Sequence, residues 1–107
     1  MNVNAKFKRI VNDWYVEPAF CVDALMDSVS FDGDMHDPCC GQGNIPKITG
    51  GTGSDLVDRS EGRYPVVDFL KDKTKRENII TNPPYRITVN IVTHALKHVQ
   101  NKIAVIV

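Results

Sequence analysis

The chain has 107 residues, 42% of them hydrophobic and 24% charged, and its 13 Lys and Arg balance 13 Asp and Glu. This length and composition predict one folded domain over residues 1–107 and exclude a disordered tail, and no apolar run reaches the ~20 residues that a bilayer span needs. A net charge of zero argues against a free-standing nucleic-acid binder, because phosphate contacts use an excess of Lys and Arg. The odd cysteine count and the lack of an apolar leader favour a cytoplasmic protein without disulfides.

The first half of the chain predicts two helices separated by a short extended segment. Apolar residues recur at helical spacing after Glu17, which predicts a helix over Pro18–Val29. Asp32, Gly33 and Asp34 end that pattern, and an extended segment then leads into Asp37. A short helix is expected over Asn44–Thr49, before three closely spaced glycines interrupt it.

The second half predicts three more strand candidates, a helix and a final strand. The strand candidates are Ser54–Val57, Tyr64–Leu70 and Asn78–Thr81. Thr88 is the expected cap of an amphipathic helix that extends to about residue 99. The continuous apolar run Ile103–Val107 suits a strand that is buried on both faces.

Strands that alternate with helices or crossing loops, and that lack alternating polarity, indicate an α/β fold. We expect a Rossmann-like, mostly parallel sheet of about five strands with helices on its faces. Ligands of such sheets bind at the carboxyl ends of the strands. The chemically unusual residues of this chain occur at those ends, in Asp37–Gly43, at Asp55, at Asp68 and in Asn82–Tyr85.

The pair Gly41 and Gly43, with Asp37 before it and Asp55 after it, is typical of a cofactor site. Glycines let backbone N–H groups approach a ligand closely, and an acid at the next strand end commonly accepts hydrogen bonds from ribose hydroxyls. The alternative is an ordinary glycine turn beside a solvated aspartate.

The segment Asn82-Pro83-Pro84-Tyr85 is the most specific motif of the chain. An amide oxygen and a carbonyl oxygen held by proline form a rigid pair of acceptors for the two hydrogens of a planar amino group. The ring of Tyr85 offers a flat face on which a planar substrate stacks. The alternative is a rigid turn with a packed tyrosine.

These motifs resemble those of class I S-adenosylmethionine-dependent methyltransferases of the N6-adenine DNA type. Residues 37–45 (DPCCGQGNI) resemble motif I of that family and residues 82–85 (NPPY) resemble motif IV. Residues 13–20 resemble motif X, residues 54–59 resemble the strand 2 motif, and residues 68–70 resemble motif III. The resemblance covers nearly the whole chain from Asp13 to Val107.

The resemblance implies a role for each matching residue. Asp55 would hold the ribose hydroxyls of S-adenosylmethionine, and Asp68 would accept from its adenine amine. The target base would be bound by Asn82, Pro83, Pro84 and Tyr85, which form the catalytic group. The residues expected to bind the cofactor are Trp14, Asp37, Cys39, Gly41, Gly43, Asp55, Asp68, Phe69 and Asn82. Two interpretations stay open for Trp14 and Tyr15: contact with the cofactor, or anchoring of the N-terminal segment.

The family's sheet continues with two more strands, which form a C-terminal hairpin. The resemblance therefore implies that this chain is truncated after its fifth strand, which leaves Ile103–Val107 as an apolar edge. A missing C-terminal segment or a second copy of the chain would cover that edge. DNA is the expected substrate of the full enzyme.

Three other interpretations stay open at this stage. The same acceptor frame suits methyl transfer to a protein glutamine amide or to a guanine amine in RNA, and the chain alone fits a non-catalytic remnant that at most binds the cofactor. A metal site is not predicted, because His36, Cys39 and Cys40 lack the spacing of a zinc knuckle.

Overall fold

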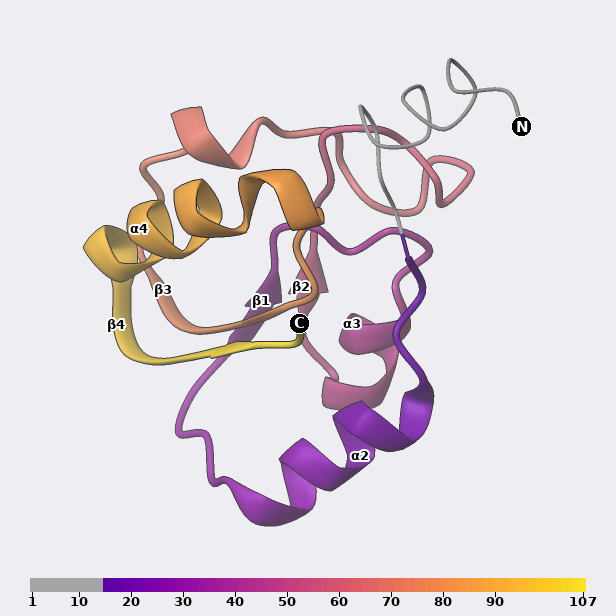
Figure 1. The fold of residues 1–107 in the computed structure, drawn as a ribbon, viewed down its shortest axis with the longest axis vertical. Coiled ribbons are helices and arrows are strands. Elements are labelled where there is room, and N and C mark those ends of the chain that lie inside the picture. The colour runs from indigo at the N-terminus through magenta and orange to yellow at the C-terminus, as the bar shows by residue number, and fades with distance from the viewer. Residues whose placement is uncertain (1–14) are drawn as a thin grey trace.

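A computed structural model describes residues 15–107 of the chain. Its strands form one parallel sheet in the order β2-β1-β3-β4 (Figure 1). The strands are β1 (Met35–Asp37), β2 (Thr52–Gly53), β3 (Arg76–Thr81) and β4 (Val99–Val105). In register, His36 of β1 lies between Thr52 of β2 and Ile79 of β3.

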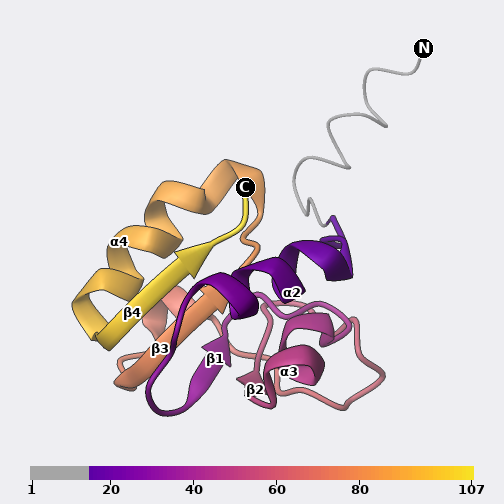
Figure 2. The same ribbon diagram turned by 90° about the horizontal axis from the view of Figure 1, so that it is seen from below.

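Helices cover both faces of this sheet, so the predicted Rossmann-like α/β fold is confirmed. The helices are α2 (Ala19–Ser28), α3 (Asn44–Thr49) and α4 (Thr88–His98), with short 3-10 turns η1 (Phe69–Lys71) and η2 (Tyr85–Ile87). Helices α2 and α3 pack on one face and α4 on the other (Figure 2). Thr88 is the first residue of α4 rather than its cap, because its hydroxyl donates to the carbonyl oxygen of Pro84 at 3.2 Å.

The two apolar cores meet at the centre of β3. Ile79 packs with Ile91 and Ala95 of α4 on one face, while Ile80 packs with Val22 and Ile45 on the other, and all six side chains are buried. Adjacent strand residues point to opposite faces, so a strand covered on both sides needs consecutive apolar residues. The Ile79-Ile80 pair meets that requirement.

A buried asparagine connects the strands to the loop before β1. The side-chain nitrogen of Asn78 donates to the carbonyl oxygens of Asp32 at 2.7 Å and Asp34 at 3.1 Å. Its side-chain oxygen accepts from the backbone N–H of Lys102 at 3.2 Å. These three bonds compensate for burying an amide that is fully inaccessible to solvent.

The winding of the sheet reverses between β1 and β3. The chain leaves β1 through α3 to reach β2 on one side, then crosses back to β3 on the other side of β1 and continues through α4 to β4. In an open parallel sheet the crevice at such a reversal, outside the carboxyl ends of the strands, is where ligands bind. Asp37 ends β1 and Thr81 ends β3 at this point.

The sheet has four strands within residues 15–107, where the sequence predicts about five, and two strand positions differ from the prediction. The second strand is the two-residue β2, so Ser54–Val57 contributes only an isolated bridge from Asp55 to Val66. Tyr64–Leu70 does not form a strand, because only Val66 pairs and residues 69–71 turn into η1. The apolar and aromatic residues of Tyr64–Leu70 favoured a strand, but pairing needs a long neighbouring strand, and β2 offers two residues.

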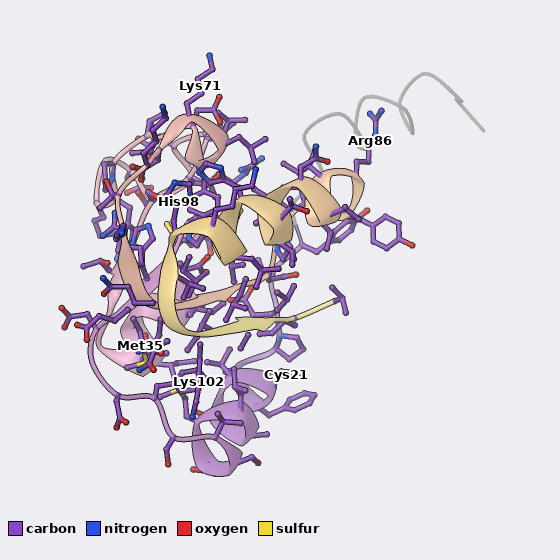
Figure 3. The ribbon with its side chains drawn as sticks, turned by 90° about the vertical axis from the view of Figure 1, so that its left-hand side faces the viewer. Cys21, Met35, Lys71, Arg86, His98 and Lys102 are labelled. Atoms are coloured by element: carbon purple, nitrogen blue, oxygen red, sulfur yellow. The ribbon has the colours of Figure 1, made fainter. Side chains whose placement is uncertain are left out.

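The last strand also differs from its predicted limits. β4 begins at Val99, directly after α4, and ends at Val105 rather than extending over Ile103–Val107. Among the described residues it pairs with β3 alone, and Ile103 packs into the α4 core while Ala104 and Ile106 pack into the other core. Lys102 of β4 extends toward α2 (Figure 3), where its ammonium donates to the carbonyl oxygen of Ser30 at 2.6 Å.

Candidate functional site

The carboxylate of Asp37 forms the base of the crevice between β1 and β3. Its oxygen Oδ1 accepts from the Thr81 hydroxyl at 2.6 Å and from the backbone N–H of Cys39 at 3.0 Å. Asp37 is 1% exposed. The first of these bonds joins the carboxyl ends of the two strands at which the winding reverses.

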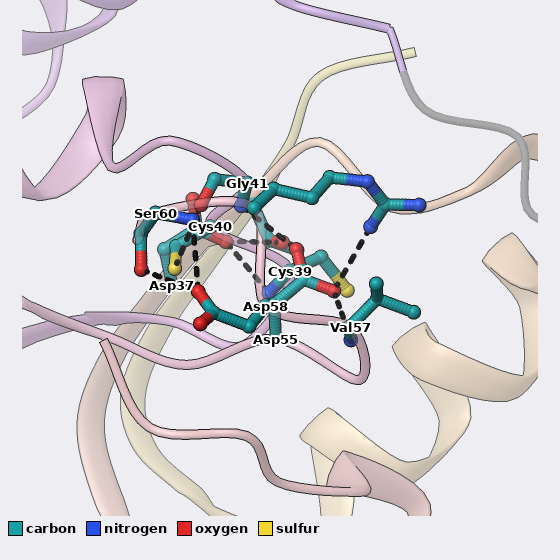
Figure 4. Close-up of polar contacts among 10 residues, drawn as sticks. Asp37, Cys39, Cys40, Gly41, Asp55, Val57, Asp58 and Ser60 are labelled. Carbon is teal, nitrogen blue, oxygen red and sulfur yellow. Dashed lines mark hydrogen bonds and ion pairs between the residues drawn. The ribbon is translucent and has the colours of Figure 1, made fainter. Parts of the chain in front are cut away.

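The glycine loop after β1 closes onto the second predicted acid (Figure 4). The backbone N–H of Gly41 donates to Oδ2 of Asp55 at 2.7 Å. The other oxygen of Asp55 accepts from the backbone N–H of Val57 at 3.3 Å and from the Arg59 guanidinium at 3.4 Å. Asp55 therefore holds the glycine loop whose sequence resembles motif I, and it already has donors on both of its oxygens.

Asn82 is oriented by residues that lie before α2. Its side-chain nitrogen donates to the carbonyl oxygen of Tyr15 at 2.8 Å and to the carboxylate of Glu17 at 3.2 Å. Two acceptors on the nitrogen side fix the amide plane, so its oxygen lies on the opposite side. That orientation suits an amide oxygen that accepts from a substrate amino group.

Three carboxylates converge at this end of the sheet. Burial raises the pKa of Asp37 to about 7, and the nearby charges of Glu17 and Asp55 raise it as well, against the opposing hydrogen bonds from Thr81 and Cys39. A cationic ligand would relieve this repulsion. The site therefore favours a ligand with positive charge over an anionic one.

The two adjacent cysteines stay protonated at neutral pH. Burial, with a contribution from the charge of Asp37, raises the pKa of the Cys39 thiol above its ordinary range and that of Cys40 to about 12. Neither thiol is a nucleophile under those conditions, because the thiolate is the reactive form. Cys40 packs as a small buried apolar residue.

The segment Asn82–Tyr85, which resembles motif IV, leaves β3 toward solvent. Pro83 is buried, Pro84 is half-buried, and the side chain of Tyr85 at the start of η2 is 81% exposed. The stacking role that the sequence predicts for this tyrosine stays a prediction.

Three predicted cofactor residues lie elsewhere or take other partners. Asp68 caps η1, where its carboxylate accepts from the backbone N–H of Leu70 at 3.1 Å. Phe69 is buried in the α4 core, its ring edge-on to His94 with centroids 4.9 Å apart. Gly43 has a positive φ of 90°, and a Cβ built there would lie 2.2 Å from the ring of Tyr64. Trp14 lies outside the described residues.

The cavity between Asp55 and Asn82 is small. A cavity of about 20 Å³ remains, whereas pockets for drug-sized ligands usually have ~300–1,000 Å³. Its walls are Tyr15, Cys39, Asp55, Arg59, Asn82, Pro83 and Pro84. The chemistry of the side chains fits a cationic cofactor with hydroxyl groups, but a molecule of that size needs Tyr15 and Arg59 to move away from Asp55.

Sequence reasoning missed three members of the site: Thr81, Glu17 and Arg59. Thr81 directly precedes the Asn82 motif, and a hydroxyl residue at the end of a buried strand is a signal that could have revealed it. The partners of Asn82 lie 65 and 67 positions away along the chain. Only the tertiary fold brings such residues together.

Within residues 15–107, no cluster of three His, Cys, Asp or Glu side chains is arranged to hold a metal ion. No helix in this part of the chain combines the length and the apolar character that a membrane span requires. Comparisons of the chain with protein-family models, with curated proteins and with solved structures found no match. Its functional class must therefore be argued from the site.

Proposed function

We propose that this chain carries the cofactor and target-amine site of an S-adenosylmethionine-dependent methyltransferase. The proposed acceptor is a planar exocyclic amino group, with adenine N6 in DNA as the first candidate. The observation that carries the proposal is the meeting of Asp37 and Asn82 with the carboxylates of Glu17 and Asp55 at the reversal between β1 and β3.

The acidic character of the crevice supports the choice of cofactor. S-adenosylmethionine supplies an electrophilic methyl group on a sulfonium, and it also carries an ammonium group at neutral pH. Burial and the neighbouring carboxylates favour the neutral form of Asp37, so a nearby cation would stabilise its charged form strongly. Asp55 would exchange its contact with Arg59 for the ribose hydroxyls, while Gly41 stays on the other oxygen.

The orientation of Asn82 supports the choice of acceptor. With Tyr15 and Glu17 on its nitrogen side, its oxygen accepts one hydrogen of the target amine, and the backbone carbonyl of Pro83 accepts the other. The exposed ring of Tyr85 stacks on the planar system that carries the amine. A target held in this way keeps its amino nitrogen in place for displacement at the methyl group.

DNA as the bearer of the amine rests on the motif resemblance. The exposed cations of the C-terminal part, among them Lys71 and Arg86, extend away from the body of the molecule (Figure 3), and in the proposed complex they would contact phosphates. An adenine in a duplex would have to be flipped out, which costs a few kcal/mol, and stacking on Tyr85 would offset part of that.

The closed cavity favours a second candidate from another class. A space of about 20 Å³ between Tyr15, Asp55 and Arg59 suits a subunit that holds its crevice shut and transfers no methyl group. The two candidates differ in a measurable way. Only the methyltransferase binds the cofactor and passes its methyl group to an amine.

Calorimetric titration with S-adenosylmethionine tests cofactor binding. We expect saturable heat with the natural chain and its loss in Asp37→Ala and Asp55→Asn, while Asp58→Asn, which removes an exposed carboxylate from the same loop, leaves it unchanged. No heat at millimolar cofactor would exclude catalysis by this chain.

Transfer of radiolabelled methyl groups to DNA tests the target site. Asn82→Ala should abolish transfer and keep the heat of cofactor binding, and Asn90→Ala, at an exposed position on α4, should change neither. If radiolabelled methyl groups still reached DNA in Asn82→Ala, the assignment of this amide to the target amine would be wrong. Cofactor heat without transfer in the natural chain would establish the closed, non-catalytic subunit instead.

A further inference from the structure

A cavity of about 410 Å³ lies over strands β1 and β2, on the same face of the sheet as α4 but beyond the part that α4 covers. Helix α4 packs over β3 and β4 together with η1, and residues 54–68 form no helix that would cover β1 and β2. The walls of this cavity are His36, Gly51, Thr52, Gly53, Ser54, Tyr64, Pro65, Val67 and Arg76. None of them lines the small cavity of the candidate methyltransferase site.

The polar side chains that line this cavity supply positive charge and hydroxyl groups. Arg76 supplies a fixed positive charge, and Thr52, Ser54 and Tyr64 supply three hydroxyl groups. No carboxylate lines it. Surfaces that combine an arginine with hydroxyl donors recognise the oxygens of phosphate groups.

Arg76 carries a donor that the rest of the structure leaves unused. Its Nε atom is buried and has no hydrogen-bond partner. Its nearest anionic contact is Asp72, whose carboxylate is 3.9 Å from Nη2, too long for a hydrogen bond. A buried donor without a partner calls for an explanation. Because Nε is closed to solvent in this conformation, a ligand oxygen reaches it only when the guanidinium turns toward the cavity.

The imidazole of His36 leaves a second donor at the same place. Its ring nitrogens contact the Thr52 hydroxyl at 2.8 Å and the Ser54 hydroxyl at 3.2 Å. A neutral imidazole donates from one nitrogen only, so one of these hydroxyls accepts from the ring and turns its own proton elsewhere. For Thr52 the alternative acceptor is the carbonyl oxygen of Met35 at 3.5 Å, a weak contact.

The volume and the remaining walls indicate the rest of the ligand. A cavity of about 410 Å³ is far larger than an inorganic phosphate needs and falls within the ~300–1,000 Å³ of small-molecule sites. Tyr64, Pro65 and Val67 form a wall with flat and apolar surface beside the polar groups. Such a wall suits a compact organic group.

We propose that this cavity binds a phosphomonoester, with the phosphate on Arg76 and on the hydroxyls of Thr52 and Ser54 and the organic group against Tyr64. The proposal uses none of the residues assigned to methyl transfer. A neighbouring cavity of about 360 Å³ shares Arg76 but is also lined by Asp34 and Glu77. Their carboxylates repel an anion, so the phosphate is expected in the cavity of about 410 Å³.

The test is a titration followed by NMR, with ribose 5-phosphate as the probe and ribose, inorganic phosphate and acetate in parallel. We expect saturable shifts at residues 36, 52 and 54, and a downfield, more slowly exchanging Nε–H of Arg76. Ribose should give no such shifts, and inorganic phosphate should bind more weakly than the ester. Acetate bound as tightly as the ester would overturn the choice of phosphate.

Substitutions at position 76 test whether the guanidinium itself, or only its positive charge, binds the phosphate. Arg76→Gln should weaken binding of ribose 5-phosphate about tenfold or more, and Arg76→Lys nearly as much because the Nε–H donor is lost. Lys75→Gln, which removes the adjacent exposed charge, should change affinity less than about twofold. Equal affinity in all four proteins, or an unchanged Nε–H signal on titration, would show that Arg76 does not bind the phosphate.

Discussion

The pKa values of two neighbouring residues of β1 are shifted in opposite directions, and one substitution should separate their contributions to stability. Burial raises the pKa of Asp37 from 3.8 to about 7, whereas burial, with help from Arg76, lowers the pKa of His36 from 6.5 to about 4. Asp37→Asn removes the first titration. The amide oxygen of the new residue can still accept from Thr81 and from the backbone of Cys39.

The signs of the two contributions are opposite. Between pH 3.8 and about 7, Asp37 binds a proton in the folded state and not in the unfolded state, so it makes the protein less stable as pH rises. Between about 4 and 6.5, His36 binds a proton only in the unfolded state, so it makes the protein less stable as pH falls. In the natural chain the two contributions nearly cancel over that shared interval.

The magnitudes follow from ~1.4 kcal/mol per pH unit of pKa difference. Asp37→Asn exposes the contribution of His36, so the free energy of unfolding of the variant should fall by about 3 kcal/mol from pH 6.5 to about 4. Above pH 7 the variant should exceed the natural chain by up to about 4 kcal/mol, because no buried charge remains at position 37.

Urea unfolding followed by far-UV circular dichroism, repeated across this pH range, measures both differences. Asp58→Asn is the matched control, because hydrogen bonds from Ser60 and Gly62 lower the pKa of that exposed carboxylate. Removing it must not stabilise the protein at neutral or higher pH. Parallel curves for Asp37→Asn and the natural chain, or a less stable variant above pH 7, would refute burial as the cause.

Two further predictions concern stability. Gly43→Ala should destabilise the fold by about 1–3 kcal/mol, because it combines a φ of 90° with a Cβ 2.2 Å from the Tyr64 ring. The control is Gly50→Ala, with a φ of 75° and open space around it, which should cost about 1 kcal/mol. Equal losses of stability in thermal unfolding would contradict a clash with Tyr64. Asn78→Ala should cost about 2 kcal/mol or more, since it removes three hydrogen bonds of a fully buried amide and leaves the backbone N–H of Lys102 without this acceptor. Urea unfolding that shows no loss would mean that water replaces the amide.

Local signals in the sequence determined much of the fold. The helix predicted over Asn44–Thr49 has these bounds in the structure, because a glycine in a left-handed conformation stands at each end, at positions 43 and 50. The long amphipathic helix begins at Thr88, one residue before the start that a Thr88 cap would give, and the predicted strand Asn78–Thr81 lies within β3. Each of these elements is encoded by residues a few positions apart.

The sequence also located part of the candidate site. Asp37 and Asn82 fall at the ends of β1 and β3, and Asp55 follows β2, which is where a parallel sheet collects its functional residues. What it did not give is their partners. The donors and acceptors around Asn82 come from residues 15 and 17, and the hydroxyl on Asp37 comes from residue 81.

The tertiary structure alone decided where β2 lies, that Tyr64–Leu70 is not a strand, and which polar groups are buried. Strand pairing and desolvation depend on contacts between residues far apart in the chain, and no periodicity within a short window reports them. The same aspartate could be a solvated turn residue in another fold. Packed beneath Thr81 and beside Glu17, it becomes a carboxyl group that titrates near neutral pH.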